Sequence, residues 1–191
     1  MGKYERKKQI IEEAARLFSA KRFDEVLMDD IAQQASVGKG TIYTYFADKE
    51  ELYFAVVFEG ISRLNQKLHS PADRREDPEK ELERMVHAIV SFFNQNRFFF
   101  RLMAREDGRS ESDKGENRKR WHEERMIQLK AIEAVLRNGT EAGAFAVENP
   151  RLAAAVLRGM VRSVMIHSED AMDIDEMVGT IMRIFLCGVR R

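Results

Sequence analysis

The stretch of residues 29–52 constrains the fold of this chain most strongly, because its pattern fits two short helices joined by a turn. Residues 31–35 place apolar side chains at helical spacing, which predicts that one face of the first helix packs into a core. Residues 36–38 interrupt that pattern, and we expect Gly38 to supply the unrestricted backbone that a tight turn requires. A second short helix follows, with its two apolar side chains four positions apart and therefore on one side.

The second helix carries basic and hydroxyl-bearing side chains on the faces that Ile42 and Phe46 leave free: Lys39, Thr41, Tyr43, Thr44 and Tyr45. So many hydrogen-bonding groups on so short a helix indicate a binding surface rather than a solvated face. A helix, a turn and a second helix with such side chains form the helix-turn-helix pattern. We therefore predict a helix-turn-helix whose second helix contacts a partner.

Composition limits the classes of protein to which the chain can belong. Its 191 residues are 34% charged and 44% hydrophobic, which is typical of a soluble globular protein. The sequence contains no apolar run of the roughly 18–20 residues that a membrane-spanning helix needs, and its start lacks the apolar core of a secretion signal. A lone cysteine, Cys187, excludes an internal disulfide and fits a reducing compartment. We therefore expect a cytoplasmic protein.

The net charge removes one simple argument for nucleic-acid binding. The whole chain has a formal net charge of +0 at pH 7, and residues 1–50 contain nine Lys or Arg against nine Asp or Glu. Bulk positive charge therefore cannot attract DNA to this chain. Any DNA contact must depend on where individual basic and hydroxyl groups lie.

The sequence predicts helices from end to end, and no strand-like alternation occurs in it. Asp48 and Glu51 have the spacing of a capping box for a helix that extends to about His69. Residues 107–118 are polar and contain glycine, which predicts an exposed loop. We predict an all-α chain of about nine helices. Its predicted parts are a helix-turn-helix domain at residues 1–50, a connecting helix at residues 51–70 and a larger helical domain at residues 71–191.

One run of residues resembles a known family. The run Lys39-Gly40-Thr41-Ile42-Tyr43-Thr44-Tyr45-Phe46, preceded by Ile31-Ala32, Ala35 and Val37 and followed by Lys49-Glu50, is similar to the TetR family of bacterial transcriptional regulators. The specific match covers roughly residues 10–55. The resemblance implies a homodimer that binds a palindromic operator in double-stranded DNA, most often as a repressor. It also implies that the C-terminal domain serves dimerisation and holds a small-molecule effector that weakens DNA binding.

The chain departs from the family pattern at three positions. Leu27 stands where the second helix usually has a Ser or Thr N-cap, and losing such a cap costs about 1 kcal/mol. Asp29 and Asp30 in the first turn compensate in part through the helix dipole. Gly38 replaces the usual Ser before the lysine, and Ser36 replaces the usual glycine of the turn. These changes affect individual backbone contacts rather than the predicted fold.

The predicted DNA-contacting residues surround the start of the second helix of the motif. Lys39 and Gly40 lie where the helix dipole favours a phosphate, and Lys49 starts the next helix. Short hydroxyl side chains suit base edges, whereas the tyrosines suit phosphates. The competing explanation is that Tyr43 and Tyr45 cover a small core and the lysines only face solvent. The predicted set is Gly38, Lys39, Gly40, Thr41, Tyr43, Thr44, Tyr45 and Lys49.

The last two helices carry the predicted dimer interface, because the first of them is apolar over much of its circumference. Ordinary closure of the monomer core explains the same pattern, and the family resemblance favours the interface. The predicted interface residues are Leu152, Val156, Gly159, Met160, Val164, Ile174, Val178, Ile181 and Phe185.

The C-terminal domain also contains many aromatic and methionine side chains, which can line an adaptable apolar pocket. Ordinary core packing explains most of them equally well. The predicted effector is an apolar or amphipathic molecule, such as a fatty acyl compound or a hydrophobic drug. The predicted pocket residues are Phe92, Phe99, Met103, Trp121, Met126 and Met165.

Other chemistry has little support in the sequence. The four histidines lie on separate segments without metal-ligand spacing, and no phosphate-binding glycine loop or nucleophile elbow occurs. We expect no catalytic residues, no metal and no cofactor, and hence no enzyme. One alternative function remains open: a protein-interaction module that uses the helix-turn-helix against a protein partner, without specific DNA binding.

Overall fold

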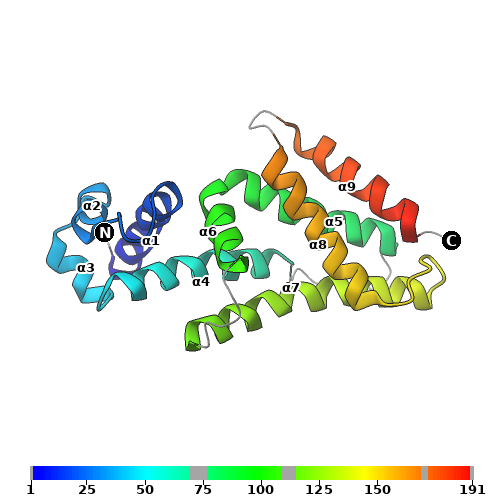
Figure 1. Ribbon diagram of the computed structural model, residues 1–191, viewed down its shortest axis with the longest axis horizontal. Coiled ribbons are helices and arrows are strands. Elements are labelled where there is room, and N and C mark those ends of the chain that lie inside the picture. Colours follow the sequence, from blue (N-terminus) through cyan, green and yellow to red (C-terminus); the bar gives the residue numbers. More distant parts are fainter. Residues whose placement is uncertain (1, 69–76, 109–114, 169–171, 190–191) are drawn as a thin grey trace. The chain divides into compact units, whose positions relative to one another are not determined.

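The computed structural model describes residues 2–68, 77–108, 115–168 and 172–189, and these residues form nine helices joined by short connections (Figure 1). The all-α prediction is confirmed. Within the described ranges, no helix is long and apolar enough to cross a membrane. The helices are α1 (Lys3–Ala20), α2 (Met28–Gln34), α3 (Lys39–Tyr45), α4 (Lys49–Leu68), α5 (Pro78–Gln95), α6 (Arg97–Asp107), α7 (Glu116–Glu141), α8 (Pro150–His167) and α9 (Ile174–Val189).

The chain divides into two compact units whose boundaries fall inside helices. The first unit comprises Met1–Arg63 and Asn96–Trp121, and the second comprises Leu64–Gln95 and His122–Arg191. Helices α4 and α7 therefore each contribute to both units, and α6 belongs with the helix-turn-helix. The predicted domains had boundaries after residues 50 and 70. Half of the predicted loop at residues 107–118 lies outside the described residues, and residues 116–118 belong to α7.

The core of the first unit is built on the apolar stripe of α1. Ile10, Ala14 and Phe18 are fully buried on that stripe, together with Ile31 of α2 and Ile42 of α3. Helices α2 and α3 have seven residues each, and isolated helices shorter than about 12–15 residues are marginal in water. Packing against α1 therefore holds the two short helices in place.

In the second unit, α5, α8 and α9 pack against one another (Figure 1). The inner side of α9 buries Val178, Ile181 and Phe185. After α7 the chain turns at Gly143, whose φ of 79° favours glycine. Gly139 permits a close approach, because a Cβ there would lie 2.3 Å from the ring of Phe145.

Two predicted helix starts are confirmed. The backbone N–H of Glu51 donates to the Asp48 carboxylate at 2.8 Å, and the Glu51 carboxylate accepts in return from Ala47. At α8 the side chain of Asn149 accepts from the N–H of Leu152 at 3.0 Å, and proline occupies the first turn.

Candidate nucleic-acid interface

The turn between α2 and α3 depends on Ser36 rather than on Gly38. Ser36 has a φ of 51°, and it is the one non-glycine residue with positive φ in the described part of the chain. Gly38 has a φ of −70°, which any residue adopts, so the expectation that this glycine supplies the unusual backbone is wrong. After Ser36 the backbone N–H of Val37 donates to the carbonyl of Ala32 at 2.9 Å and closes α2.

Both helices of the motif begin without a side-chain cap, as the sequence predicted. Leu27 is the N-cap residue of α2, forms no side-chain cap hydrogen bond and exposes 58% of its surface. Gly38 is the N-cap residue of α3 and has no side chain to offer. The backbone N–H of Thr41 donates to the carbonyl of Gly38 at 2.8 Å, so the N–H groups of Lys39 and Gly40 are the ones left for an outside acceptor.

Lys39 is paired within the chain. Its Nζ lies 2.7 Å from Oδ1 of Asp29 on α2, and both side chains are more than half exposed. The hydrogen bond to Asp29, followed by the charge of that carboxylate, raises the pKa of Lys39 above its ordinary value of 10.5. A second carboxylate of the same turn, Asp30, lies 3.6 Å from Nζ of Lys21. The two aspartates in the first turn of α2 thus neutralise the charges of two lysines within the first unit.

The exposed side of α3 contains the predicted contact residues. Gly38, Lys39, Gly40, Tyr43 and Thr44 are exposed. Thr41 and Tyr45 are half-buried. A Cβ added at Gly40 would meet nothing within 4 Å, so the fold itself does not require glycine at this position. Glycine there instead allows another molecule to approach the helix closely.

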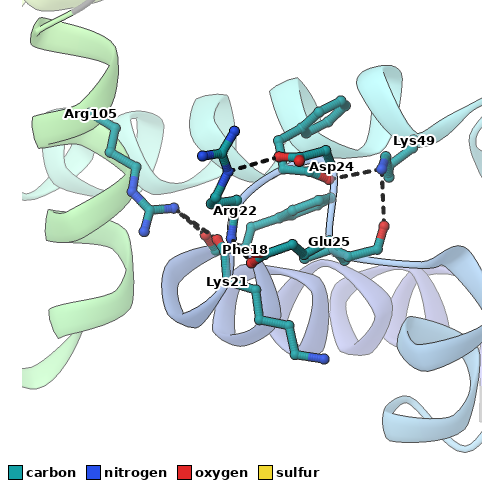
Figure 2. A network of polar contacts seen from close by, with 9 residues as sticks. Phe18, Lys21, Arg22, Asp24, Glu25, Lys49 and Arg105 are labelled. Carbon is teal, nitrogen blue, oxygen red and sulfur yellow. Dashed lines mark hydrogen bonds and ion pairs between the residues drawn. The ribbon is translucent and has the colours of Figure 1, made fainter.

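Three of the predicted contact side chains also have partners inside the chain. The Thr44 hydroxyl donates to the carbonyl of Gly40 at 3.0 Å, and the Tyr45 hydroxyl donates to the carbonyl of Lys3 at 3.2 Å. Lys49 donates to the carbonyls of Phe23 and Val26 at 2.8 and 3.0 Å (Figure 2). The Lys49 ammonium therefore fastens the connection between α1 and α2.

Sequence reasoning missed the residue that binds the carbonyls at the C-terminal end of α1. The guanidinium of Arg105, on α6, donates to the carbonyls of Phe18 and Lys21 at 2.5 and 3.1 Å (Figure 2). It also donates to the carbonyl of Ser19 at 3.3 Å. These carbonyls belong to the last turn of α1, where the helix dipole favours a positive charge. The same turn of α6 also carries Glu106, which accepts a 2.6 Å hydrogen bond from the buried Tyr53 hydroxyl.

The six predicted effector-pocket residues divide between the two units. Phe99, Met103 and Trp121 belong to the first unit, and Phe92, Met126 and Met165 belong to the second. All are buried except Met126, which is half-buried. Phe99 packs on Gly60, where a Cβ would lie 2.6 Å from its ring, so core packing accounts for this residue.

The second unit contains a buried polar cluster that the sequence did not reveal. Asn65 donates to the Glu124 carboxylate at 2.9 Å, and Arg125 donates to Oε1 of Gln128 at 2.5 Å. Gln128 is 3% exposed, and its Nε2 has no hydrogen-bond acceptor among the described residues. Buried polar groups in an apolar helical core are normally satisfied, so the cluster calls for a further acceptor.

The predicted dimer residues fall into three groups by exposure. Leu152 and Val156 expose 61% and 52% of their surfaces, and Gly159 is exposed beside them. Met160, Val164 and Ile174 are half-buried. Val178, Ile181 and Phe185 are buried within the second unit, and Phe185 also lines the groove described next, so their contact with a partner stays a prediction.

An exposed apolar groove accompanies the first group. It has a volume of about 560 Å³ and is lined by residues that include Leu152, Val156 and Met160 of α8 and Ile184 of α9. Ile184 exposes 59% of its surface and was missed by the sequence analysis. Its position on the outer side of α9 becomes evident only when the inner side is known.

Comparisons with known proteins agree with this geometry. A family model described as "Bacterial regulatory proteins, tetR family" matches residues 10–56, and one described as "Tetracyclin repressor-like, C-terminal domain" matches residues 75–188. The chain is 37% identical over 92 residues to the uncharacterized HTH-type transcriptional regulator YhgD of Bacillus subtilis. These residues are 46% of this chain and 46% of the relative. The match spans less than half of the length of this curated relative.

Two solved structures share the fold over nearly the whole chain. The TetR family transcriptional regulator PfmR from Thermus thermophilus is 26% identical, with a TM-score of 0.77 over 95% of this chain and 99% of that one. The regulator FadR from Bacillus subtilis is 18% identical, with a TM-score of 0.78 over 95% and 98% of the two chains. Since the C-terminal model alone covers more than half of the residues, the chain belongs to the tetR family of bacterial regulatory proteins.

Proposed function

We propose that this protein is a ligand-responsive transcriptional regulator, acting as a repressor, that binds a palindromic DNA operator as a homodimer. The observation that supports this function best is the exposed start of α3. Its first N–H groups lack a side-chain cap, its glycine at position 40 has open space around it, and Tyr43 and Thr44 flank it. A helix end with these properties suits a phosphate and an adjacent major groove.

Individual groups then have distinct roles. The N–H groups after Gly38 bind a phosphate, Thr41 and Thr44 contact base edges, and Tyr43 donates its hydroxyl to the DNA backbone. Lys39 exchanges the carboxylate of Asp29 for a phosphate. Tyr45 and Lys49 support the interface from inside the head, since their donors already hold backbone carbonyls. Affinity falls with salt with a log–log slope of about −0.9 per neutralised phosphate.

One α3 helix contacts few bases, so specific binding requires two copies of the protein at a fixed spacing on the DNA. In this proposal the groove between α8 and α9, lined by Leu152, Val156 and Met160, packs against the same groove of a second copy. Two recognition helices must then lie about 34–36 Å apart to enter successive major grooves. The interface therefore controls DNA binding.

The effector belongs to the second unit in this proposal. The Nε2 donor of Gln128 and the neighbouring Arg125 would bind a polar or anionic head group. The surrounding apolar side chains would bind the hydrocarbon part of the effector. FadR from Bacillus subtilis was solved in complex with stearoyl-CoA, which makes stearoyl-CoA the first compound to test. Binding would favour dimers whose heads no longer match successive grooves.

Gly40→Ala tests the DNA-binding proposal directly. Alanine is about 1 kcal/mol better than glycine inside a helix, and its Cβ has room, so the variant should unfold no more easily than the wild type. Its affinity for the DNA upstream of its own gene should fall, because the methyl group separates α3 from the duplex. Fluorescence anisotropy measures the affinity, with unrelated DNA as competitor and Gly179→Ala, a second exposed helical glycine, as the control.

A second candidate function is a protein-interaction module. The exposed Leu27 and the neutral Lys39–Asp29 pair favour it, because both suit a protein surface better than a phosphate. The anisotropy experiment distinguishes the two functions. Equal binding of upstream and unrelated DNA, or no binding at low salt, would reject the operator and favour a protein partner.

A further inference from the structure

A cleft in the first unit has the shape of a ligand site and is not used by the proposed DNA contacts. Its two walls are matched helix faces: four residues of α1 from Tyr4 to Ile11, and four residues of α4 from Ala55 to Ser62. In both sets the residues follow the i, i+3, i+4, i+7 spacing of one helix face. Arg120, near the start of α7, completes the lining. The volume of about 440 Å³ is within the range of about 300–1,000 Å³ for small-molecule sites.

The charges of this cleft favour an anion. Lys7, Lys8 and Arg120 line it, against a single carboxylate, that of Glu59. Glu59 is compensated from outside the lining, because its Oε1 accepts from Nε of Arg63 at 2.8 Å. The cleft therefore concentrates positive charge in a chain whose formal net charge is +0.

The floor of the cleft favours a flat apolar body. Ile11 and Phe58 are 6% and 7% exposed and present apolar surface at its base. The guanidinium of Arg120 lies over the Phe58 ring, 4.0 Å from its centroid, in a cation–π contact. Tyr4, which is 81% exposed, places a second aromatic ring at the rim.

We propose that this cleft binds a small planar aromatic anion, such as an aryl carboxylate. The ring packs against Ile11 and the edge of Phe58 that Arg120 leaves uncovered, and the anionic group contacts Lys8, Arg120 or both. A DNA phosphate is the competing occupant of the cations, but it would make no use of the apolar floor. Every lining residue belongs to the first unit, so this site is separate from the groove on α8 and α9 and from the buried polar cluster.

Three probes with one ring system and three charges test the ligand class. Isothermal titration calorimetry of the full chain should show naphthoate binding about tenfold more tightly than naphthalenemethanol, because charge-assisted hydrogen bonds are about twice as strong as neutral ones. Naphthylmethylammonium should bind most weakly. Equal affinities for the three probes, or the reverse order, would overturn the proposal.

Variants locate the site. Arg120→Gln should weaken naphthoate binding about fivefold and reduce the preference for the anion, in line with a partly exposed charge pair. Arg16→Gln is the matched control, since Arg16 is an exposed arginine of α1 that pairs with Glu13 and does not line the cleft. Ser62→Trp should fill the cleft and abolish binding of all three probes, with an unchanged circular-dichroism spectrum as the check on folding.

Two outcomes would reject the cleft. Naphthoate binding that survives Ser62→Trp, or that falls equally in Arg120→Gln and Arg16→Gln, would place the ligand elsewhere. If naphthoate does not bind and Lys8→Gln with Arg120→Gln lowers DNA affinity, the cations bind DNA phosphates instead. The probes are measured without DNA, so failure of this proposal and failure of operator binding are distinguishable.

Discussion

Ser36 shows how a single residue can carry strain that the pattern of its neighbours conceals. Its φ of 51° lies in the left-handed region, which costs a non-glycine residue about 1–2 kcal/mol. The sequence pointed to Gly38 because glycine is the usual signal for a turn. The chain places glycine two residues later, where the backbone is ordinary, and Ser36 adopts the demanding conformation.

Ser36→Gly should therefore stabilise the protein. Relief of the left-handed cost exceeds the extra backbone entropy that glycine loses, about 0.5–1 kcal/mol, and leaves a net gain of about 0.5–1 kcal/mol in the free energy of unfolding. Urea denaturation measures the change. Gly143→Ala, at a φ of 79°, should show the opposite sign. A Ser36→Gly variant no more stable than the wild type would show that the turn is not strained.

Asp29 restrains Lys39, so Asp29→Asn should raise DNA affinity. The free lysine contacts a phosphate without first losing its partner, and one more neutralised phosphate makes the salt slope steeper by about 0.9. Asp30→Asn removes the same charge from the same turn but releases Lys21, which follows α1. An equal gain in both variants would indicate a general charge effect instead.

The pH dependence of this restraint follows from the raised pKa of Lys39. A group with a raised pKa in the folded state contributes its stabilisation below its ordinary value of 10.5 and loses it as pH rises through the folded value. The lysine is therefore charged at neutral pH. The difference in DNA affinity between Asp29→Asn and the wild type should stay constant over about pH 6–9.

At the scale of helices, the local signals in the sequence succeeded and the distant ones failed. The capping box at Asp48 and the Asn149–Pro150 start were predictable because a cap and its partner lie three residues apart. The role of Arg105 was not, since its carbonyl partners lie 84 to 87 positions earlier. The apolar side of α9 was predictable from its residue spacing. Whether that side is buried within the monomer was not, because this depends on its contacts with α5 and α8.

Arg105→Met should weaken the attachment of α6 to α1. It removes a cation from the C-terminal carbonyls of α1, and we expect the free energy of unfolding to fall by about 1–2 kcal/mol. Arg101→Met, an exposed position on the same helix, should change it by less than about 0.5 kcal/mol. Equal effects of the two substitutions in thermal denaturation would mean that the hydrogen bonds of Arg105 to α1 add no specific stability.

At the scale of the whole molecule, Leu152→Asp should separate association from folding. A charge on this exposed position opposes a second copy, so sedimentation should report a monomer, with reduced DNA affinity and unchanged monomer stability. Val178→Ala, a buried position on α9, should instead lower the free energy of unfolding by about 2 kcal/mol and leave the association state intact. A Leu152→Asp variant that still dimerises would move the interface elsewhere.

The first unit is assembled from two separate lengths of chain, and this limits how the protein can be cut or recombined. A fragment ending near residue 50 keeps the helix-turn-helix but loses Tyr53, Arg105 and Glu106. In this fragment Phe18 loses its edge-to-face contact with Tyr53, whose ring centroid lies 5.2 Å away. The C-terminal end of α1 also loses the guanidinium of Arg105. Hybrid regulators should therefore carry residues 96–121 together with residues 1–63, because the helix-turn-helix transferred alone lacks the residues of α4 and α6 that pack against α1.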